Sequence, residues 1–258
     1  MKTRMRFTKT GSLKFIGHLD CMRFFQKAFR RAGLDVAYTG GFSPHQIMSF
    51  ASPLSVGTTS DGEYMDVTFH SLPDVPEAEL LVRINAQMTE EIFVSEIHVL
   101  DEQDVAAKKT SMALLHACDY MITWKDGTTF GANVSPKSQI DLRETFCSFM
   151  AQESIPVKKK TKRSVQEINL KPFILGFACS GEEFEGVTGA VLPELNNEYD
   201  SEDQLYLKLV SGSVANIKPE LVLEAYAHYL NVEVEPFSYQ VHRIQMYFMD
   251  KAQEGMGA

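Results

Sequence analysis

Two adjoining segments carry the strongest pattern in this chain: GHLDCMRFFQKAFRRAGL, residues 17–34, and GGFSPHQIMSFASPLSVGTTSDGEYMDV, residues 40–67. The first predicts an amphipathic helix, because apolar residues recur at three- and four-residue spacing. The expected apolar stripe is Phe15, Leu19, Met22, Phe25, Phe29 and Ala32. The second places Gly, Pro and His between apolar runs, where chains often carry functional groups. Together they predict a binding site beside a basic helix.

Charge is distributed unevenly along the chain. The first 31 residues hold nine Lys or Arg and one acid, Asp20, although the chain has a net charge of −9. This concentration predicts a local anion-binding surface. The nine cations are Lys2, Arg4, Arg6, Lys9, Lys14, Arg23, Lys27, Arg30 and Arg31.

The bulk composition predicts a two-domain cytoplasmic protein. A length of 258 residues suits two domains of about 100–150 residues, and no apolar run approaches the ~20 residues of a membrane span. The amino terminus lacks the apolar core of a signal peptide. The four cysteines are too widely spaced for a zinc or iron–sulfur signature, so we expect reduced thiols and no metal or cofactor. They are Cys21, Cys118, Cys147 and Cys179.

The expected fold class is α+β, a tandem of two ferredoxin-like β-α-β-β-α-β units. The first, residues 1–100, has strands at 4–9, 47–50, 63–69 and 93–100 and helices at 15–32 and 77–88. The second, residues 119–248, has strands at 119–125, 171–179 and 204–210 and helices at 139–152 and 219–230. Its last strand falls at 232–236 or at 238–247, and residues 181–203 form a long acidic connection.

Two groups of cations are candidates for nucleic-acid binding. On the first helix Arg23, Lys27, Arg30 and Arg31 lie opposite the apolar stripe and could hold phosphates, or could be an ordinary solvated face. The second group is either a flexible loop or part of the same polyanion-binding function. It consists of Lys158, Lys159, Lys160, Lys162 and Arg163.

His18, Asp20 and His45 are the candidates for catalysis. A His–His–Asp trio could bind a metal or exchange protons near neutral pH. The alternative is that His18 packs locally and His45 bonds its own loop. Glu63 and Asp66 do not form a carboxylate pair, because residues three apart on a strand face opposite ways.

A rigid turn is predicted after the first helix, since glycine permits positive φ and proline fixes its own φ. Its residues are Gly41, Phe42, Ser43, Pro44 and His45. Phe42 is expected in the core, with base stacking as the alternative. We expect the turn to hold His45 near Arg23 or Arg30.

Residues 7–34 and 41–67 resemble the radical SAM-linked protein family of uncharacterised bacterial domains. Residues 157–174 and 241–248 are also similar, whereas QIMSFA at 46–51 departs from the family pattern. The resemblance implies a partner, a radical SAM enzyme of the B12-binding type, and implies no activity or catalytic residues. The family pattern carries over onto His18, Asp20, Arg23, Arg30, Arg31, Gly41, Phe42, Pro44, His45, Pro53, Leu54, Gly57, Ser60, Glu63 and Asp66.

The sequence therefore predicts a non-catalytic module that binds RNA or presents a substrate to a radical SAM enzyme. One alternative is an RNA-processing or RNA-modifying enzyme that uses His18, Asp20 and His45. Another is a protein–protein adaptor. No membrane partner is expected.

Overall fold

The computed structural model describes residues 1–101, 105, 110–125, 141–160, 165–192, 203–212, 215–235 and 237–249. The chain divides into two compact units of mixed α and β structure, Met1–His116 with Gln245–Ala258 and Ala117–Ile244. Both boundaries fall inside strands, β6 (Leu115–Trp124) and β11 (Tyr239–Phe248). Within the described ranges, no helix is long and apolar enough to cross a membrane.

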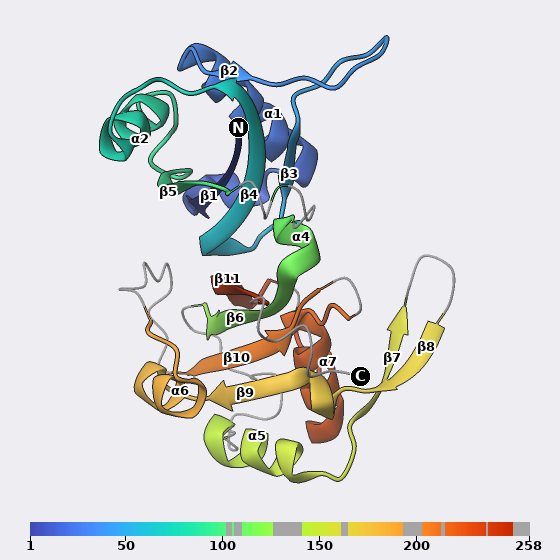
Figure 1. The fold of residues 1–258 in the computed structure, drawn as a ribbon. Coiled ribbons are helices and arrows are strands. Elements are labelled where there is room, and N and C mark those ends of the chain that lie inside the picture. Colours follow the sequence, from blue (N-terminus) through green and yellow to red (C-terminus); the bar gives the residue numbers. More distant parts are fainter. Residues whose placement is uncertain are drawn as a thin grey trace. The chain divides into compact units, whose positions relative to one another are not determined.

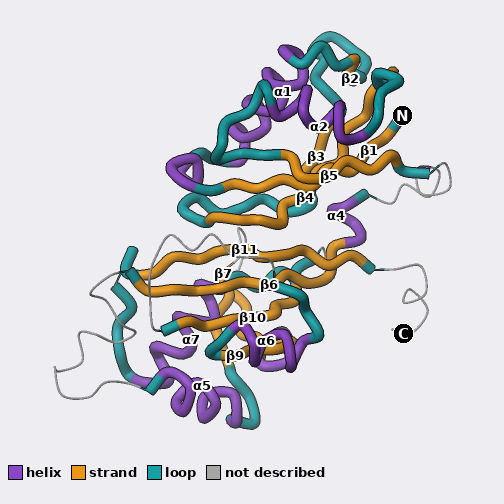
Figure 2. Tube along the Cα trace, turned by 90° about the vertical axis from the view of Figure 1, so that its left-hand side faces the viewer, coloured by secondary structure: helices purple, strands orange, loops and turns teal. Residues whose placement is uncertain are grey.

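The first unit is an antiparallel sheet with two longer helices on one face (Figures 1 and 2). Its strands have the order β5-β1-β4, and β2 and β3 also pair with β4. Its elements are β1 (Lys2–Lys9), the 3-10 helix η1 (Gly11–Phe15), α1 (His18–Arg31), β2 (Asp35–Val36), β3 (Met48–Phe50), β4 (Thr59–Ser71), α2 (Glu77–Asn85), β5 (Val94–Val99) and the short α4 (Ser111–Leu114).

Strand β1 positions several polar groups by simple alternation. Its buried side chains include Met5, Phe7 and Lys9, and its half-exposed side chains include Arg4 and Arg6. This period of two is that of a strand with one face against the core. Lys9 therefore occupies a position at which the pattern calls for an apolar residue, and it requires polar partners there.

Helix α1 buries Cys21, Phe25 and Phe29 against the sheet. The predicted stripe is wrong at its amino-terminal end, where Phe15 is 64% and Leu19 62% exposed. Phe15 lies before the helix, in η1. Leu19 lies two residues before the buried Cys21. Two residues are more than half a helical turn, so Leu19 points away from the core.

Within the described residues, the main sheet of the second unit has the strand order β11-β6-β10-β9, and β7 and β8 form a separate hairpin. The β6–β10, β9–β10 and β7–β8 pairs are antiparallel. Besides β6 and β11, its elements are α5 (Leu142–Ala151), β7 (Pro156–Lys160), β8 (Val165–Asn169), the 3-10 helix η2 (Lys171–Phe173), β9 (Ile174–Ala178), α6 (Gly181–Thr188), β10 (Gln204–Val210) and α7 (Pro219–Leu230).

Helices cover both faces of this second sheet. Neighbouring residues Tyr206 and Leu207 face opposite sides of β10. Leu207 is the register partner of Phe177, whose ring lies 5.2 Å from that of Phe146 on α5. Tyr206 instead contacts Phe184 of α6, with 5.5 Å between ring centroids. Helices α5 and α6 therefore lie on opposite faces, which explains why β6 is buried along nearly its whole length.

Helix α6 lies at the start of the segment that the sequence predicted only as a long acidic connection. The Ser180 side chain accepts a hydrogen bond from the Glu183 N–H at 3.3 Å, and Gly189 ends the helix with φ of 67°. Ser-x-x-Glu followed by glycine is a recognised helix start and stop, so the signal was in the sequence. Of the two expected positions for the last strand, the later one agrees with β11.

Candidate functional site

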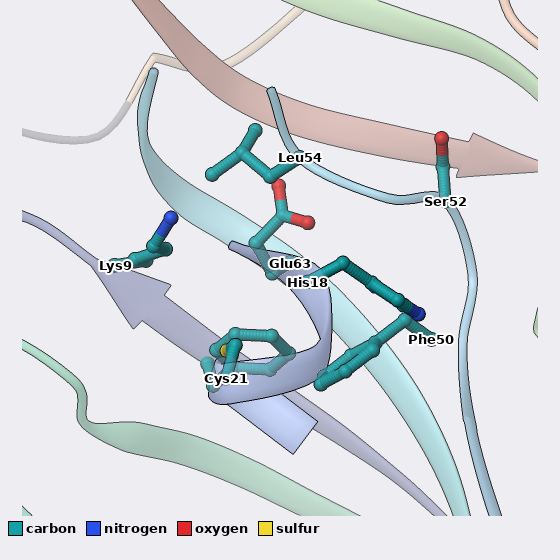
Figure 3. A pocket seen from close by; sticks show the side chains of 8 residues that line it. Lys9, His18, Cys21, Phe50, Ser52, Leu54 and Glu63 are labelled. Atoms are coloured by element: carbon teal, nitrogen blue, oxygen red, sulfur yellow. The ribbon is translucent and has the colours of Figure 1, made fainter. Parts of the chain in front are cut away.

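His18 lines a small pocket of mixed polar and apolar residues in the first unit, where α1 begins (Figure 3). Its cavity has a volume of about 20 Å³, which is room for one water molecule. The lining residues come from β1, α1, β3, β4 and the segment after β3, so the pocket forms only when the unit folds. They are Phe7, Lys9, His18, Cys21, Phe50, Ser52, Leu54 and Glu63.

Lys9 is the buried cation of this pocket. Its Nζ donates hydrogen bonds to the carbonyl oxygens of Lys14 at 3.2 Å and Ile16 at 3.0 Å. Burial lowers the pKa of the Lys9 ammonium, and the neighbouring Cys21 and Glu63 act in the opposite direction. The two carbonyls lie in η1 and just after it, so Lys9 fastens this turn to the sheet. Its donors serve structure first, which argues against a free amine nucleophile.

The Cys21 thiol is not activated as a nucleophile. Burial raises the pKa of its thiol to about 11, with Lys9 lowering it and Glu63 raising it further. A thiol, rather than a thiolate, is therefore present at neutral pH, and the thiol is the poor nucleophile of the two forms. The pocket has neither an activated cysteine nor space for a substrate beside it.

We expect the stability of the first unit to fall at alkaline pH because of Cys21. The folded pKa of about 11 exceeds the usual 9.0, so the folded state retains the proton when the unfolded state loses it. The contribution is complete below pH 9 and declines as the pH rises toward 11. Denaturant unfolding across this range should show a shallower decline for Cys21→Ala than for wild type. Cys147→Ala, at the exposed cysteine, should keep the wild-type slope, and equal slopes for all three proteins would contradict the assignment.

The three candidate catalytic residues have separate environments. The His18 ring packs edge-on against Phe50, with 5.1 Å between centroids. Asp20 is exposed and pairs with Arg23 at 3.1 Å. His45 hydrogen-bonds through Nδ1 to the Thr39 hydroxyl at 3.1 Å. Only His18 lines the pocket, and no group of three His, Cys, Asp or Glu suited to a metal occurs among the described residues.

The loop after β2 forms an arm that extends away from the rest of the first unit (Figure 1). Tyr38 and Gln46 pair across its base, and Gln46 Nε2 lies 3.4 Å from the Gln26 carbonyl oxygen of α1. Phe42 is fully exposed, so its expected place in the core is wrong. Gly41 has φ of 101°, which carries the chain through the turn. Arm and helix thus touch at Gln26, while the hydrogen-bond partner of His45 is Thr39 on the arm itself.

The amino-terminal cations divide into two groups with different surroundings. Five serve the interior or its margin: Lys2 and Arg4 pair with Asp66, Arg6 pairs with Glu96, and Lys9 and Lys14 are buried. The other four are the exposed cations of α1, which we call the α1 basic face. They are Arg23, Lys27, Arg30 and Arg31.

Within the α1 basic face, two cations already have partners. Arg23 pairs with Asp20, and Arg31 donates to the Gln87 carbonyl oxygen at 2.6 Å. Lys27 and Arg30 have no side-chain partner within the described parts of the chain. Two exposed, unneutralised cations one helical turn apart can bind an anion of extended shape.

The second group of cations lies on β7 of the second unit. Lys158 is exposed, and Lys159 donates to the Asn216 carbonyl oxygen at 2.8 Å. Lys160 ends the strand, and Lys162 and Arg163 lie outside the described residues. The chain is thus a strand up to Lys160, where a flexible loop was one of the two alternatives. The pairing of this strand with β8 was not predicted.

A family model described as an uncharacterized protein conserved in bacteria (DUF2344) matches residues 2–219. The chain belongs to the DUF2344 family. A comparison with curated proteins found no match. The matched residues include the pocket, the arm, the α1 basic face and the hairpin, and the family description assigns them no activity.

Sequence reasoning missed two buried titratable residues of the pocket in this DUF2344 protein. Lys9 and Cys21 line the pocket, yet neither was a candidate. The available signal was the alternation of β1, which places Lys9 on the core face after Met5 and Phe7. The opposed facing of Glu63 and Asp66 is confirmed, because Glu63 lines the pocket while Asp66 pairs with Arg4 from the other side of the sheet.

Proposed function

We propose that this protein is a non-catalytic RNA-binding module that presents RNA to a radical SAM enzyme in the bacterial cytoplasm. The observation that carries the proposal is the α1 basic face, with Lys27 and Arg30 exposed and unneutralised in a chain of net charge −9. Phosphate backbones are bound by such rows of cations, with arginine adding bidentate geometry. The cavity beside His18 holds about one water molecule, so the proposal places no reaction there.

We also propose that each unit is ferredoxin-like. In the first, the order β5-β1-β4-β3 corresponds to strands 4-1-3-2 of a β-α-β-β-α-β chain. In the second, β11-β6-β10-β9 gives the same order, with the β7-β8 hairpin and α6 as additions. RNA-binding proteins use paired units of this kind, although fold alone does not establish function.

The radical SAM partner is supported by the sequence resemblance over residues 7–67. Four widely separated cysteines do not form a cluster-binding motif, so the radical chemistry is assigned to the partner and not to this chain. The role left to this protein is to hold and orient the substrate.

A protein–protein adaptor is the second candidate, and the arm favours it. A fully exposed Phe42 at the end of a projecting loop is a suitable anchor for a hydrophobic pocket on a partner. This alternative gains weight if the protein does not bind RNA.

The test is filter binding of single-stranded RNA over a range of salt concentrations. Replacing Lys27 and Arg30 together with glutamine should weaken binding to all sequences and flatten the plot of log affinity against log salt by about one to two units. The fold should persist, because both side chains are exposed. Arg143→Gln with Lys218→Gln makes the same charge change in the second unit and should keep the wild-type slope. Equal affinity and slope for the α1 variant and wild type would make the basic face an ordinary solvated surface.

A further inference from the structure

The second unit has a groove of about 490 Å³ that the proposed α1 interface does not use. This volume is within the ~300–1,000 Å³ of small-molecule sites. Three segments form its walls: the end of α5, the chain entering β7, and one face of α7. Its lining is Phe149, Gln152, Ile155, Pro156, Val157, Lys158, Leu221, Glu224, Ala225, His228 and Tyr229.

Helix α7 has one side in the core of the unit and another side along the groove. One side of the helix, including Val222, Leu223 and Tyr226, is buried in the unit. Leu221, Ala225 and His228 recur at four- and three-residue spacing on another side and line the groove. The helix therefore contributes to the core and to a concave surface at once.

Two aromatic rings are among the residues that line the groove. Phe149 is buried, and its ring centroid lies 5.6 Å from that of Tyr229. Tyr229 is 42% exposed and lines the groove. A supported and partly open aromatic ring is suited to stack on a planar ligand.

Opposite charges line the groove without pairing. Lys158, Glu224 and His228 are exposed, and none has a side-chain hydrogen bond or ion pair within the described part of the chain. The hairpin register places Glu167 opposite Lys158, yet these two form no described ion pair either. The Glu224 carboxylate is therefore available to N–H donors of a ligand, and the Lys158 ammonium is available to an anionic group of the same ligand.

We infer that this groove binds a guanine nucleotide of single-stranded RNA. The inference rests on the proposed function, which supplies the RNA. A purine stacks on Tyr229, and Lys158 holds its phosphate at the point where the basic strand begins. Glu224 distinguishes guanine, because a carboxylate offers two acceptors and guanine presents two adjacent N–H groups, on N1 and N2.

The first experiment uses mononucleotides, which need no contact with α1. GMP, IMP and AMP are titrated into the full chain by calorimetry, with saturation-transfer NMR as a second readout. GMP should bind about tenfold or more tightly than AMP, and IMP, without the N2 amine, should be intermediate. Glu224→Gln should remove the preference, and Tyr229→Leu should weaken GMP and AMP alike by about fivefold or more. Glu182→Gln, the same charge change at an exposed position of α6 outside the groove, should leave binding unchanged.

The second experiment compares an oligoadenylate with the same strand carrying one guanosine. The guanosine should raise affinity in wild type and in the Lys27/Arg30 variant, and should have no effect in Glu224→Gln. Absence of GMP binding, equal affinity for GMP and AMP, or an unchanged preference in Glu224→Gln would overturn the inference. GMP selectivity without any gain from the guanosine in the strand would overturn its RNA part. If the groove behaves as expected while the α1 variant binds RNA like wild type, the α1 interface fails and the groove stands.

Discussion

Replacing Asp66 with alanine is expected to destabilise the first unit by about 3–5 kcal/mol, the usual result of removing one partner from a buried ion pair. The Asp66 carboxylate is almost fully buried and lies 2.9 Å from Arg4 Nε. It also accepts the Ser111 N–H at 2.7 Å and lies 3.9 Å from Lys2 Nζ. The variant leaves the Arg4 guanidinium, which is mostly buried, without its anion. It also frees the start of α4 from the sheet.

Hydrogen exchange of amides in β1 and β4 is the suitable measurement, since the single tryptophan, Trp124, belongs to the second unit. Glu96→Ala is the matched control, because it removes a carboxylate 3.1 Å from Arg6 in the same sheet. Glu96 is 41% exposed, so its loss should cost at most about 1 kcal/mol. Similar losses for the two variants would show that burial of Asp66 is not what makes its pair important.

Phe25→Ala is expected to cost about 3–5 kcal/mol in the same unit, through lost contacts and the cavity left behind. The Phe25 ring is fully buried. Its centroid lies 4.8 Å from the ring centroid of Phe7, 5.8 Å from that of Phe29 and 6.0 Å from that of Phe50. Phe7 and Phe50 also line the pocket beside His18. The substitution should therefore move the NMR resonances of His18, which packs on Phe50, as well as lower the denaturation midpoint.

The comparison variant is Phe15→Ala. It removes the same side chain a short distance earlier in the chain, from a position that is 64% exposed. Its effect should stay within about 0.5 kcal/mol, as for most surface substitutions. A cost comparable to that of Phe25→Ala would mean that η1 packs more tightly than its exposure indicates.

These two phenylalanines also show how far periodicity alone can be used. The spacing from Met22 onward predicted the buried side of α1, because a helix that covers a sheet must bury one stripe. It failed at Phe15, because spacing does not reveal where a 3-10 turn gives way to a helix. It failed at Leu19, because the helix buries the side that carries Cys21 and Phe25 and Leu19 lies on another side. The same limit applies to α6, whose cap residues were visible but whose apolar stripe is short.

The candidate site was harder to foresee than the elements that carry it. His18 was a catalytic candidate and Glu63 was considered only as half of a carboxylate pair. The pocket that they share with Lys9 depends on segments far apart in the sequence. Phe42 was expected inside because most phenylalanines are. Its exposure follows from the arm, whose direction depends on the Tyr38–Gln46 pairing and not on its composition.

By itself, the sequence determined the alternation of strands and helices, the basic face of α1 and the opposed facing of Glu63 and Asp66. These features depend on local periods of 2 and 3.6 residues, which the sequence states directly. Only the tertiary structure decided which cations remain available. Lys2, Arg4, Arg6, Lys9 and Lys14 are used for ion pairs and buried contacts, while Lys27 and Arg30 are left exposed. The groove of the second unit likewise arises from α5, β7 and α7 together, because a concave surface requires walls from segments that meet only on folding.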